Sequence, residues 1–387
     1  MGFSFAASIS VVTPILSIFL SNVAAVSFSL IGVVTGAFFV SSAITKMLIG
    51  LVAGGRMTIG LLLPAFILLS ISAAFYPLTC DTVVLVLLRA IQGIAYAFIQ
   101  TTLMILALLT LSSAERDKGV GTYAASLSLG ALAGPAITSV TVPIVGISNT
   151  FFFSSVVGTI GIFGAYSMVR KTFSLEKKWQ IIGIKTQKIQ LRERVSAILR
   201  SRMFVIALVS NFTFFAFFGI ILAYAPLYAK AKLGIDYAFV SILFLLYYVS
   251  TAILRLSIGK ILVKIQKKTF LTMILGLGVL LSILFVTTTS PAIFAAAFAL
   301  LGVVQGAVFP VGSMLIAEYI EPSKNVLASS IFATSLDVGQ GLAPLVVGAT
   351  VIYLGLDLVF ALATALPISA TIFVMLLSTN SSSQRKI

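Results

Sequence analysis

The feature that most constrains the fold is a series of long, almost uninterrupted apolar runs. A membrane-spanning helix needs about 20 mostly apolar residues, and a bilayer tolerates only helices and closed barrels. The runs lack the period-two alternation of barrel strands. We therefore predict an all-α integral membrane protein with twelve transmembrane helices, at 3–20, 28–50, 59–77, 83–110, 119–141, 150–169, 203–228, 237–258, 269–288, 292–316, 326–350 and 356–377.

Composition agrees with this prediction and excludes most other classes of protein. The chain of 387 residues is 60% hydrophobic and 9% charged, whereas soluble proteins average about 25% charged residues. It contains no His, and Cys80 is its only cysteine, so we expect no catalytic residues, no cofactor and no metal site. The phosphate-loop pattern GxxxxGK[ST] is also missing from the sequence. We therefore do not expect an enzyme or an ATP-driven motor.

The positive charges are distributed unevenly along the chain. If both termini are cytoplasmic, 20 of the 25 Lys and Arg residues fall on the cytoplasmic side, and only Lys230 and Lys232 fall outside. Such a bias orients a membrane protein, so the net charge of +15 does not indicate a nucleic-acid partner. Ten of these residues lie in 170–202, where we expect contact with anionic membrane lipids. We predict a multi-pass protein of the cell membrane with both termini cytoplasmic.

The chain also repeats itself. AITKMLIG (43–50) aligns with AILRLSIG (252–259), and GALAGP (130–135) aligns with GQGLAP (339–344), both at a shift of 209 residues. LLRAIQG (87–93) aligns with LLGVVQG (300–306) at a shift of 213. Internal repeats in a fixed order indicate duplicated architecture. We predict a six-helix half at 1–169, a basic cytoplasmic linker at 170–202, and a second six-helix half with a short cytoplasmic tail at 203–387.

These features resemble the major facilitator superfamily of secondary transporters, whose halves are parallel repeats. Gly121, Gly130 and Gly134-Pro135 have a spacing similar to the antiporter motif found mainly in exporters of that family, with Thr138-Ser139 in place of its final Gly-Gly. RAIQG (89–93) is similar to the motif with a buried Arg followed by Gln-Gly. The loop after the second span departs from the family pattern, because Gly54 stands where the family has an Asp that latches the halves.

The resemblance implies a central cavity lined by the first, fourth, seventh and tenth spans, and a moving interface between the halves. The cavity would be apolar with scattered hydrogen-bonding groups, which favours a small lipophilic organic solute. Its candidate residues are Thr13, Ser17, Gln92, Tyr96, Gln100, Asn211, Phe214, Phe217, Tyr224, Gln305 and Phe309. The candidate gating and interface residues are Lys46, Gly50, Gly121, Gly130, Gly134, Pro135, Arg255, Gly259, Gly341 and Pro344.

Two charged residues inside predicted spans are candidates for proton coupling. Arg89 shares one helical face with Gln92, Tyr96 and Gln100, and a charge at that depth must face the helix bundle or water. Asp337 is the only acidic residue deep in a predicted span, and a carboxyl group can take and release a proton. Lys46 and Arg255 are its candidate partners. The alternative for Arg89 is that it ties its span to a neighbouring carbonyl or lies near a water-exposed end, and the alternative for Asp337 is a structural hydrogen bond or ion pair.

We expect a proton-coupled exporter of a small, mostly lipophilic solute that works by alternating access. One alternative is an uncoupled uniporter or importer of a neutral metabolite. Another is a membrane sensor that does not transport, in which only the basic segment 170–202 would bind a partner. The resemblance implies a monomer whose partners are a small-molecule substrate, protons and membrane lipids.

Overall fold

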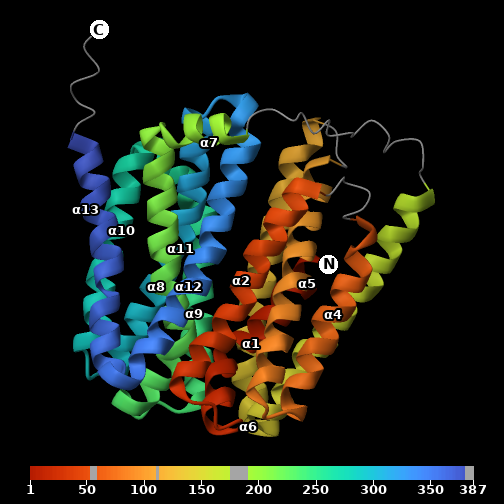
Figure 1. Cartoon of the computed structure of the whole chain (residues 1–387), viewed down its shortest axis with the longest axis vertical. Coiled ribbons are helices and arrows are strands. Elements are labelled where there is room, and N and C mark those ends of the chain that lie inside the picture. The colour runs from red at the N-terminus through yellow and green to blue at the C-terminus, as the bar shows by residue number, and fades with distance from the viewer. Residues whose placement is uncertain (53–58, 110–112, 175–190, 380–387) are drawn as a thin grey trace. The chain divides into compact units, whose positions relative to one another are not determined.

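The computed structural model describes residues 1–52, 59–109, 113–174 and 191–379, and this part of the chain is built of helices (Figure 1). The helices are α1 Gly2–Asn22, α2 Phe28–Val52, α4 Leu62–Phe75, the 3-10 helix η1 Tyr76–Leu78, α5 Thr82–Leu109, α6 Ser113–Ser174, α7 Leu191–Leu199, α8 Arg202–Leu233, α9 Tyr237–Lys264, α10 Lys267–Thr287, α11 Pro291–Tyr319, α12 Pro322–Ala363 and α13 Ala365–Thr379. Gly54 and residues 175–190 of the basic linker lie outside the described residues.

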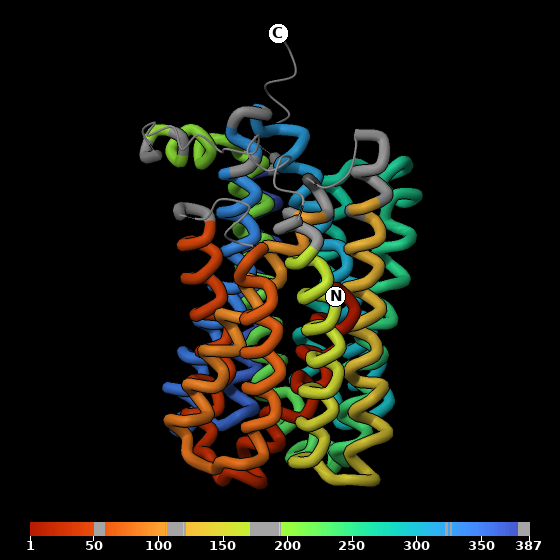
Figure 2. The backbone as a smooth tube through the Cα atoms, turned by 90° about the vertical axis from the view of Figure 1, so that its right-hand side faces the viewer, coloured from red at the N-terminus to blue at the C-terminus, as the bar shows by residue number. Residues whose placement is uncertain are grey.

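Two helices are longer than one membrane crossing because each bends at a glycine. α6 has 62 residues and bends at Gly146, where φ is 80°. α12 has 42 residues and bends at Gly355, where φ is 73°. Only glycine adopts such positive φ values without a steric penalty. Figure 2 shows the yellow part of the tube, α6, reaching the lower end and returning. α6 therefore supplies two predicted spans, and α12 with α13 supplies two more.

The number of spans agrees with the prediction. Among the described residues, nine helical stretches are long and apolar enough to cross a membrane. Two of these stretches contain the bends at Gly146 and Gly355, so each provides two membrane crossings: Gly121–Arg170 and Leu327–Leu377. The shorter apolar stretch Leu62–Leu78 completes the set. The prediction of twelve transmembrane helices in an all-α membrane protein is confirmed.

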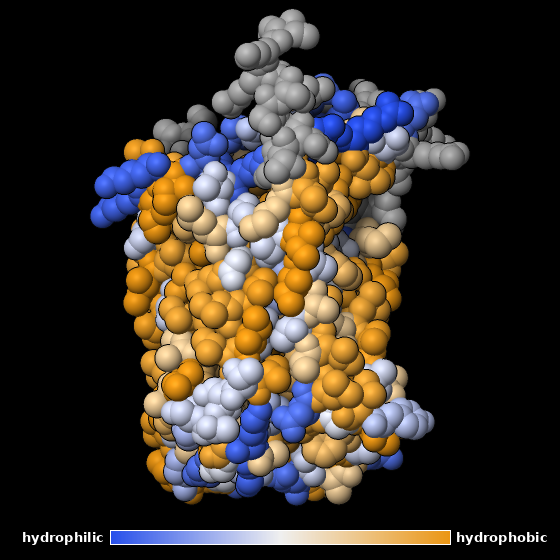
Figure 3. Space-filling model, turned by 90° about the vertical axis from the view of Figure 1, so that its left-hand side faces the viewer, coloured by the Kyte–Doolittle hydropathy of each residue, from blue (hydrophilic) through white to orange (hydrophobic). Residues whose placement is uncertain are grey.

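Large apolar side chains cover much of the surface, as expected of a protein surrounded by lipid. Leu256 is 84% exposed, Val263 86% and Ile144 74%, whereas soluble proteins rarely display large contiguous apolar patches. On the face shown in Figure 3, orange apolar residues cover the middle and blue hydrophilic residues gather towards the two ends. The outer surface is therefore suited to the hydrocarbon of a bilayer.

The described helices form two compact units. Unit 1 comprises Met1–Thr186 and Ile235–Leu245, and unit 2 comprises Gln187–Gly234 and Leu246–Ile387. Within unit 1, α1 packs on α6, α2 packs on α5, and α4 contacts both α5 and α6. Within unit 2, α8 packs on α11, α12 and α13, while α10 packs on α11 and α13. Each unit has its own buried core, which includes Phe66 in unit 1 and Phe332 in unit 2.

The two units make matching internal contacts at a constant shift of 209 residues. The rings of Phe19 and Phe151 lie 5.0 Å apart in unit 1. Their counterparts in unit 2, Tyr228 and Phe360, lie 4.4 Å apart. Gly130 packs against the carbonyl oxygen of Phe3, and its counterpart Gly339 packs against that of Phe212. The sequence repeat therefore reflects a repeated packing arrangement.

The same contacts correct the third sequence alignment. Gly93 on α5 packs against the backbone carbonyl of Phe38 on α2. In unit 2, Gly302 makes this contact with Tyr247, which is the counterpart of Phe38. The alignment of 87–93 with 300–306 is therefore wrong by one helical turn, and the shift remains 209. The error arose because Gln-Gly is a short match, and a glycine one turn along a helix lies on nearly the same face.

Candidate functional site

Arg89 and Asp337 are the only charged side chains that are buried among the described residues. Arg89 on α5 is 7% exposed, and Asp337 on α12 is fully buried. Burying a charge is costly, so buried charges are normally held by specific interactions. Both residues were predicted from the sequence as candidate site residues.

Arg89 lies in a polar cluster built from three helical segments. Its Nη1 donates a hydrogen bond of 2.7 Å to Oε1 of Gln92, one turn further along α5. The same oxygen accepts a hydrogen bond of 3.0 Å from the hydroxyl of Tyr76 in η1. The guanidinium also lies over the ring of Phe38 on α2, 4.5 Å from its centroid, an arrangement that stabilises a cation. We call Arg89, Gln92, Tyr76 and Phe38 the Arg89 cluster.

The start of α5 fixes the position of this cluster along the chain. Asp81 lies just before the helix, and its Oδ1 accepts hydrogen bonds from the backbone N–H groups of Val83 and Val84, at 2.8 and 3.1 Å. Such a cap satisfies N–H groups that have no partner within the helix. Arg89 follows about two turns later, so capping sets the depth at which the guanidinium enters unit 1.

The remaining predicted residues of the first unit lie along and beside the same face of α5. Tyr96 packs on the rings of Phe5 and Phe38, at 5.3 and 5.1 Å, and Lys46 Nζ lies 4.9 Å from its ring centre. Gln100 is half-buried, and its backbone carbonyl accepts a hydrogen bond from Tyr123. On α1, the hydroxyl of Thr13 bonds to the carbonyl of Ile9, and Ser17 is fully buried.

Asp337 lies in a part of α12 that packs closely on α8. Nδ2 of Asn211 on α8 donates to the Phe332 carbonyl at 3.0 Å and to Ser335 Oγ at 2.9 Å. A Cβ on Gly339 would lie 2.6 Å from the Phe212 carbonyl oxygen. These contacts precede and follow Asp337 along α12, so its backbone has little freedom to move.

The predicted aromatic residues of α8 belong to a continuous aromatic row in unit 2. The ring of Phe214 stacks 6.3 Å from that of Phe218, which stacks 4.9 Å from Tyr247 of α9. Phe217 and Tyr224 are also buried. On α11, Oε1 of Gln305 accepts a hydrogen bond from Thr251, and the ring of Phe309 lies 5.2 Å from that of Phe332.

Some predicted interface residues have clear packing roles within one unit. Gly130 and Gly134 allow α6 to approach the backbone of α1 at Phe3 and Ser10. Thr138, at a position where the antiporter motif has glycine, donates a hydrogen bond to the Val11 carbonyl of α1 at 3.2 Å. The glycines of the motif therefore serve close helix packing inside unit 1, and an additional role between the halves stays a prediction.

The other predicted interface residues occupy varied environments. Pro135 lies within α6, and Gly341 and Pro344 are buried in α12. Gly121 and Gly259 have open space where a side chain would project. Arg255 is half-buried, and its electrostatic neighbours are Tyr247 and Tyr248 of the same helix. Gly50 lies in α2.

Sequence reasoning missed Tyr76, Phe38 and Phe332, which hold predicted residues in place. They lie on helices other than those of the residues they contact, so no spacing within one span could indicate them. The internal repeat gave a partial indication of Phe38. Phe38 and Tyr247 occupy equivalent positions in the two units, and each contacts a glycine. Helix-face analysis finds neighbours on one helix but not across helices.

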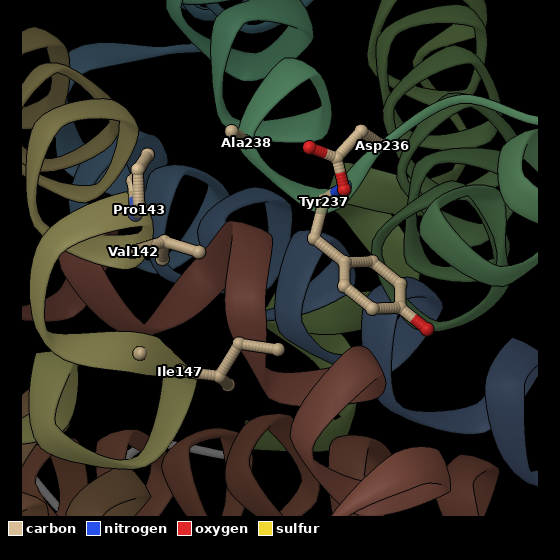
Figure 4. A pocket seen from close by; sticks show the side chains of 7 residues that line it. Val142, Pro143, Ile147, Asp236, Tyr237 and Ala238 are labelled. Atoms are coloured by element: carbon tan, nitrogen blue, oxygen red, sulfur yellow. The ribbon is translucent and has the colours of Figure 1, made fainter.

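A small pocket lies at the bend of α6, apart from the predicted cavity residues. Figure 4 shows Val142, Pro143 and Ile147 from α6 facing Asp236, Tyr237 and Ala238 at the start of α9. Its volume is about 320 Å³. Oδ1 of Asp236 accepts a hydrogen bond of 2.7 Å from the backbone N–H of Tyr237, and the Tyr237 hydroxyl accepts one from Asn22. The pocket contains none of the predicted cavity residues.

Comparisons with known proteins complete the description. The family described as Major Facilitator Superfamily matches residues 1–292 and 208–387. The crystal structure of the nucleoside transporter NupG superposes with a TM-score of 0.75 at 12% identity, covering 97% of this chain and 96% of that one. An inward-facing, unoccupied bacterial homolog of the human lysosomal transporter Spinster gives 0.74 at 13% identity, covering 98% of this chain and 94% of that one. No curated protein matched the chain.

Proposed function

Because the chain belongs to the major facilitator superfamily, and is therefore a transporter rather than an enzyme, we propose that it exports a small, mostly lipophilic organic solute in exchange for protons. Alternating access between its halves moves the solute. The protein works in the cell membrane as a monomer with both termini cytoplasmic. The basic residues of 170–202 contact anionic lipids, in keeping with their number.

The observation that carries the proposal is the complete burial of Asp337. Every other acidic side chain for which an exposure is described lies nearer the surface. A carboxyl group is the chemical group best suited to taking and releasing a proton within a membrane, and acidic residues there commonly serve proton relays. Asp337 takes and releases the coupling proton, and Arg89 is the second candidate for a role in coupling.

The side chains of the predicted cavity support a lipophilic solute. Phe214, Phe217 and Tyr224 are aromatic, and Thr13, Ser17 and Gln305 supply isolated hydrogen-bonding groups. Aromatic walls with few polar groups suit ligands that bury apolar surface and are oriented by a few hydrogen bonds. Sugars would need many more hydrogen-bonding partners. The solute is therefore expected to be apolar over most of its surface.

Transport in inside-out membrane vesicles tests this proposal. Vesicles with an acidic interior are given lipophilic carboxylates, lipophilic cations, neutral amphiphiles, sugars and nucleosides in turn, and proton efflux is followed with an internal pH indicator. Nucleosides are included because one of the similar folds is that of a nucleoside transporter. We expect one lipophilic class to cause proton efflux in the wild type and none in Asp337→Asn.

Glu318→Gln is the matched control, because Glu318 is an exposed acid on α11 that pairs with Lys267. This variant should transport and release protons like the wild type. Proton efflux retained in folded Asp337→Asn would contradict the assignment of the proton to Asp337. Solute movement that ignores the pH difference in the wild type would instead support the uncoupled uniporter.

A further inference from the structure

The Arg89 cluster has an apolar counterpart in unit 2. At a shift of 209 residues, Phe298 corresponds to Arg89, Leu301 to Gln92, Phe285 to Tyr76 and Tyr247 to Phe38. The Phe298 ring packs edge-on against Tyr247 at 6.1 Å and against Phe285 at 5.8 Å. The same place in the fold is therefore filled without a charge or an amide. Packing alone does not require the polar side chains of unit 1.

Hydrogen-bond accounting shows what the Arg89 cluster lacks. Oε1 of Gln92 accepts from both Arg89 and Tyr76, which fixes the orientation of the amide because arginine can only donate. Nε2 of Gln92 and Nε of Arg89 are buried and have no acceptor among the described residues. Buried donors are almost always paired. The cluster thus offers two donors on neighbouring groups and lacks acceptors for them.

The buried positive charge of Arg89 also lacks a negatively charged partner among the described residues. Ion pairs in the described part of the chain include those of Lys232 with Asp357, Lys267 with Glu318 and Lys324 with Glu321. Within that part of the chain, Arg89 has an amide and an aromatic ring as its partners and no carboxylate. A buried guanidinium without an anion is costly. An anion that binds to it would balance the charge and supply the missing acceptors.

We propose that the Arg89 cluster binds a small monoanionic acceptor group, of which a carboxylate is the best match. A guanidinium binds carboxylates through charge-assisted hydrogen bonds, and Gln92 Nε2 adds a neutral donor. Arg89 keeps 7% of its surface exposed while Gln92 and Tyr76 keep none, so of these three residues Arg89 is the one that an incoming anion meets first. The inference rests on the proposed function in one respect only: the anionic group is taken to belong to the transported solute.

Binding to the purified wild-type protein, measured by isothermal titration in a zwitterionic buffer, tests the inference without any transport. The probes are benzoate, its neutral isostere benzamide, and chloride. Binding of benzoate but not chloride identifies a carboxylate site, and binding of chloride as well identifies a site that also takes free inorganic anions. Benzamide should not bind. Failure of the proton-coupling experiment would leave these results unchanged, so the two proposals fail separately.

The decisive variant is the double substitution Arg89→Phe/Gln92→Leu, which places the residues of unit 2 at these two positions and should fold. It should abolish anion binding. Arg89→Lys keeps the charge but loses the planar donors, and it should weaken binding about ten- to hundredfold. Lys267→Gln, which removes a positive charge from unit 2, should bind like the wild type. Undiminished binding in the folded double variant or in Arg89→Lys, or no binding of either anion to the wild type, would overturn the inference.

Discussion

At the residue scale, the polar groups of unit 1 depend on one another. Gln92 Oε1 accepts from both Arg89 and Tyr76, so these two donors share one acceptor. The sequence predicted that Arg89 and Gln92 share a helical face. It could not predict Tyr76 or Phe38, because contacts between helices depend on packing geometry rather than on spacing within one helix. This interdependence leads to a test of stability.

Gln92→Leu alone should destabilise the protein by about 3 kcal/mol, because it leaves a buried guanidinium and a buried hydroxyl without their acceptor. Arg89→Phe/Gln92→Leu should recover part of this loss, since it removes the buried guanidinium together with its acceptor and leaves only the Tyr76 hydroxyl unpaired. Unfolding free energies in mixed micelles measure both. A double variant as unstable as the single one would contradict this account of the cluster.

At the element scale, the apolar runs predicted the spans well because a bilayer permits little else. The breaks near 141–150 and 350–356 were also located correctly, and their physical basis is a glycine with positive φ at Gly146 and at Gly355. The sequence could not identify which of its 29 glycines lie against a neighbouring backbone. That information, together with the correct register of the repeat at Gly302, required the structure.

Alanine substitutions should separate the two kinds of glycine. Gly93→Ala and Gly302→Ala each place a Cβ against a backbone carbonyl, of Phe38 and Tyr247 respectively. Backbone can adjust less readily than a side chain, so each should cost about 1–3 kcal/mol. Gly121→Ala, where the added Cβ meets open space, should be neutral or stabilising by up to about 1 kcal/mol. Thermal unfolding midpoints provide the comparison, and equal shifts at all three positions would contradict the repeated close contacts.

At the scale of the whole molecule, two units with the same packing carry different chemistry. Arg89 in unit 1 corresponds to Phe298 in unit 2, whereas Asp337 in unit 2 corresponds to Ser128 in unit 1. Each unit thus contributes one buried charge at a position that is neutral in the other. The sequence predicted the fold, the number of spans and both charges. It could not identify the solute, because recognition depends on side chains from several helices acting together.

In the proposed mechanism, Asp337 binds and releases the proton that is exchanged for the solute. The most direct measurement is proton release by the purified protein in weakly buffered detergent solution, followed with a pH indicator as the transported solute is added. We expect the wild type to release protons on binding the solute and folded Asp337→Asn to bind it without release. Equal proton release from both proteins would contradict the claim.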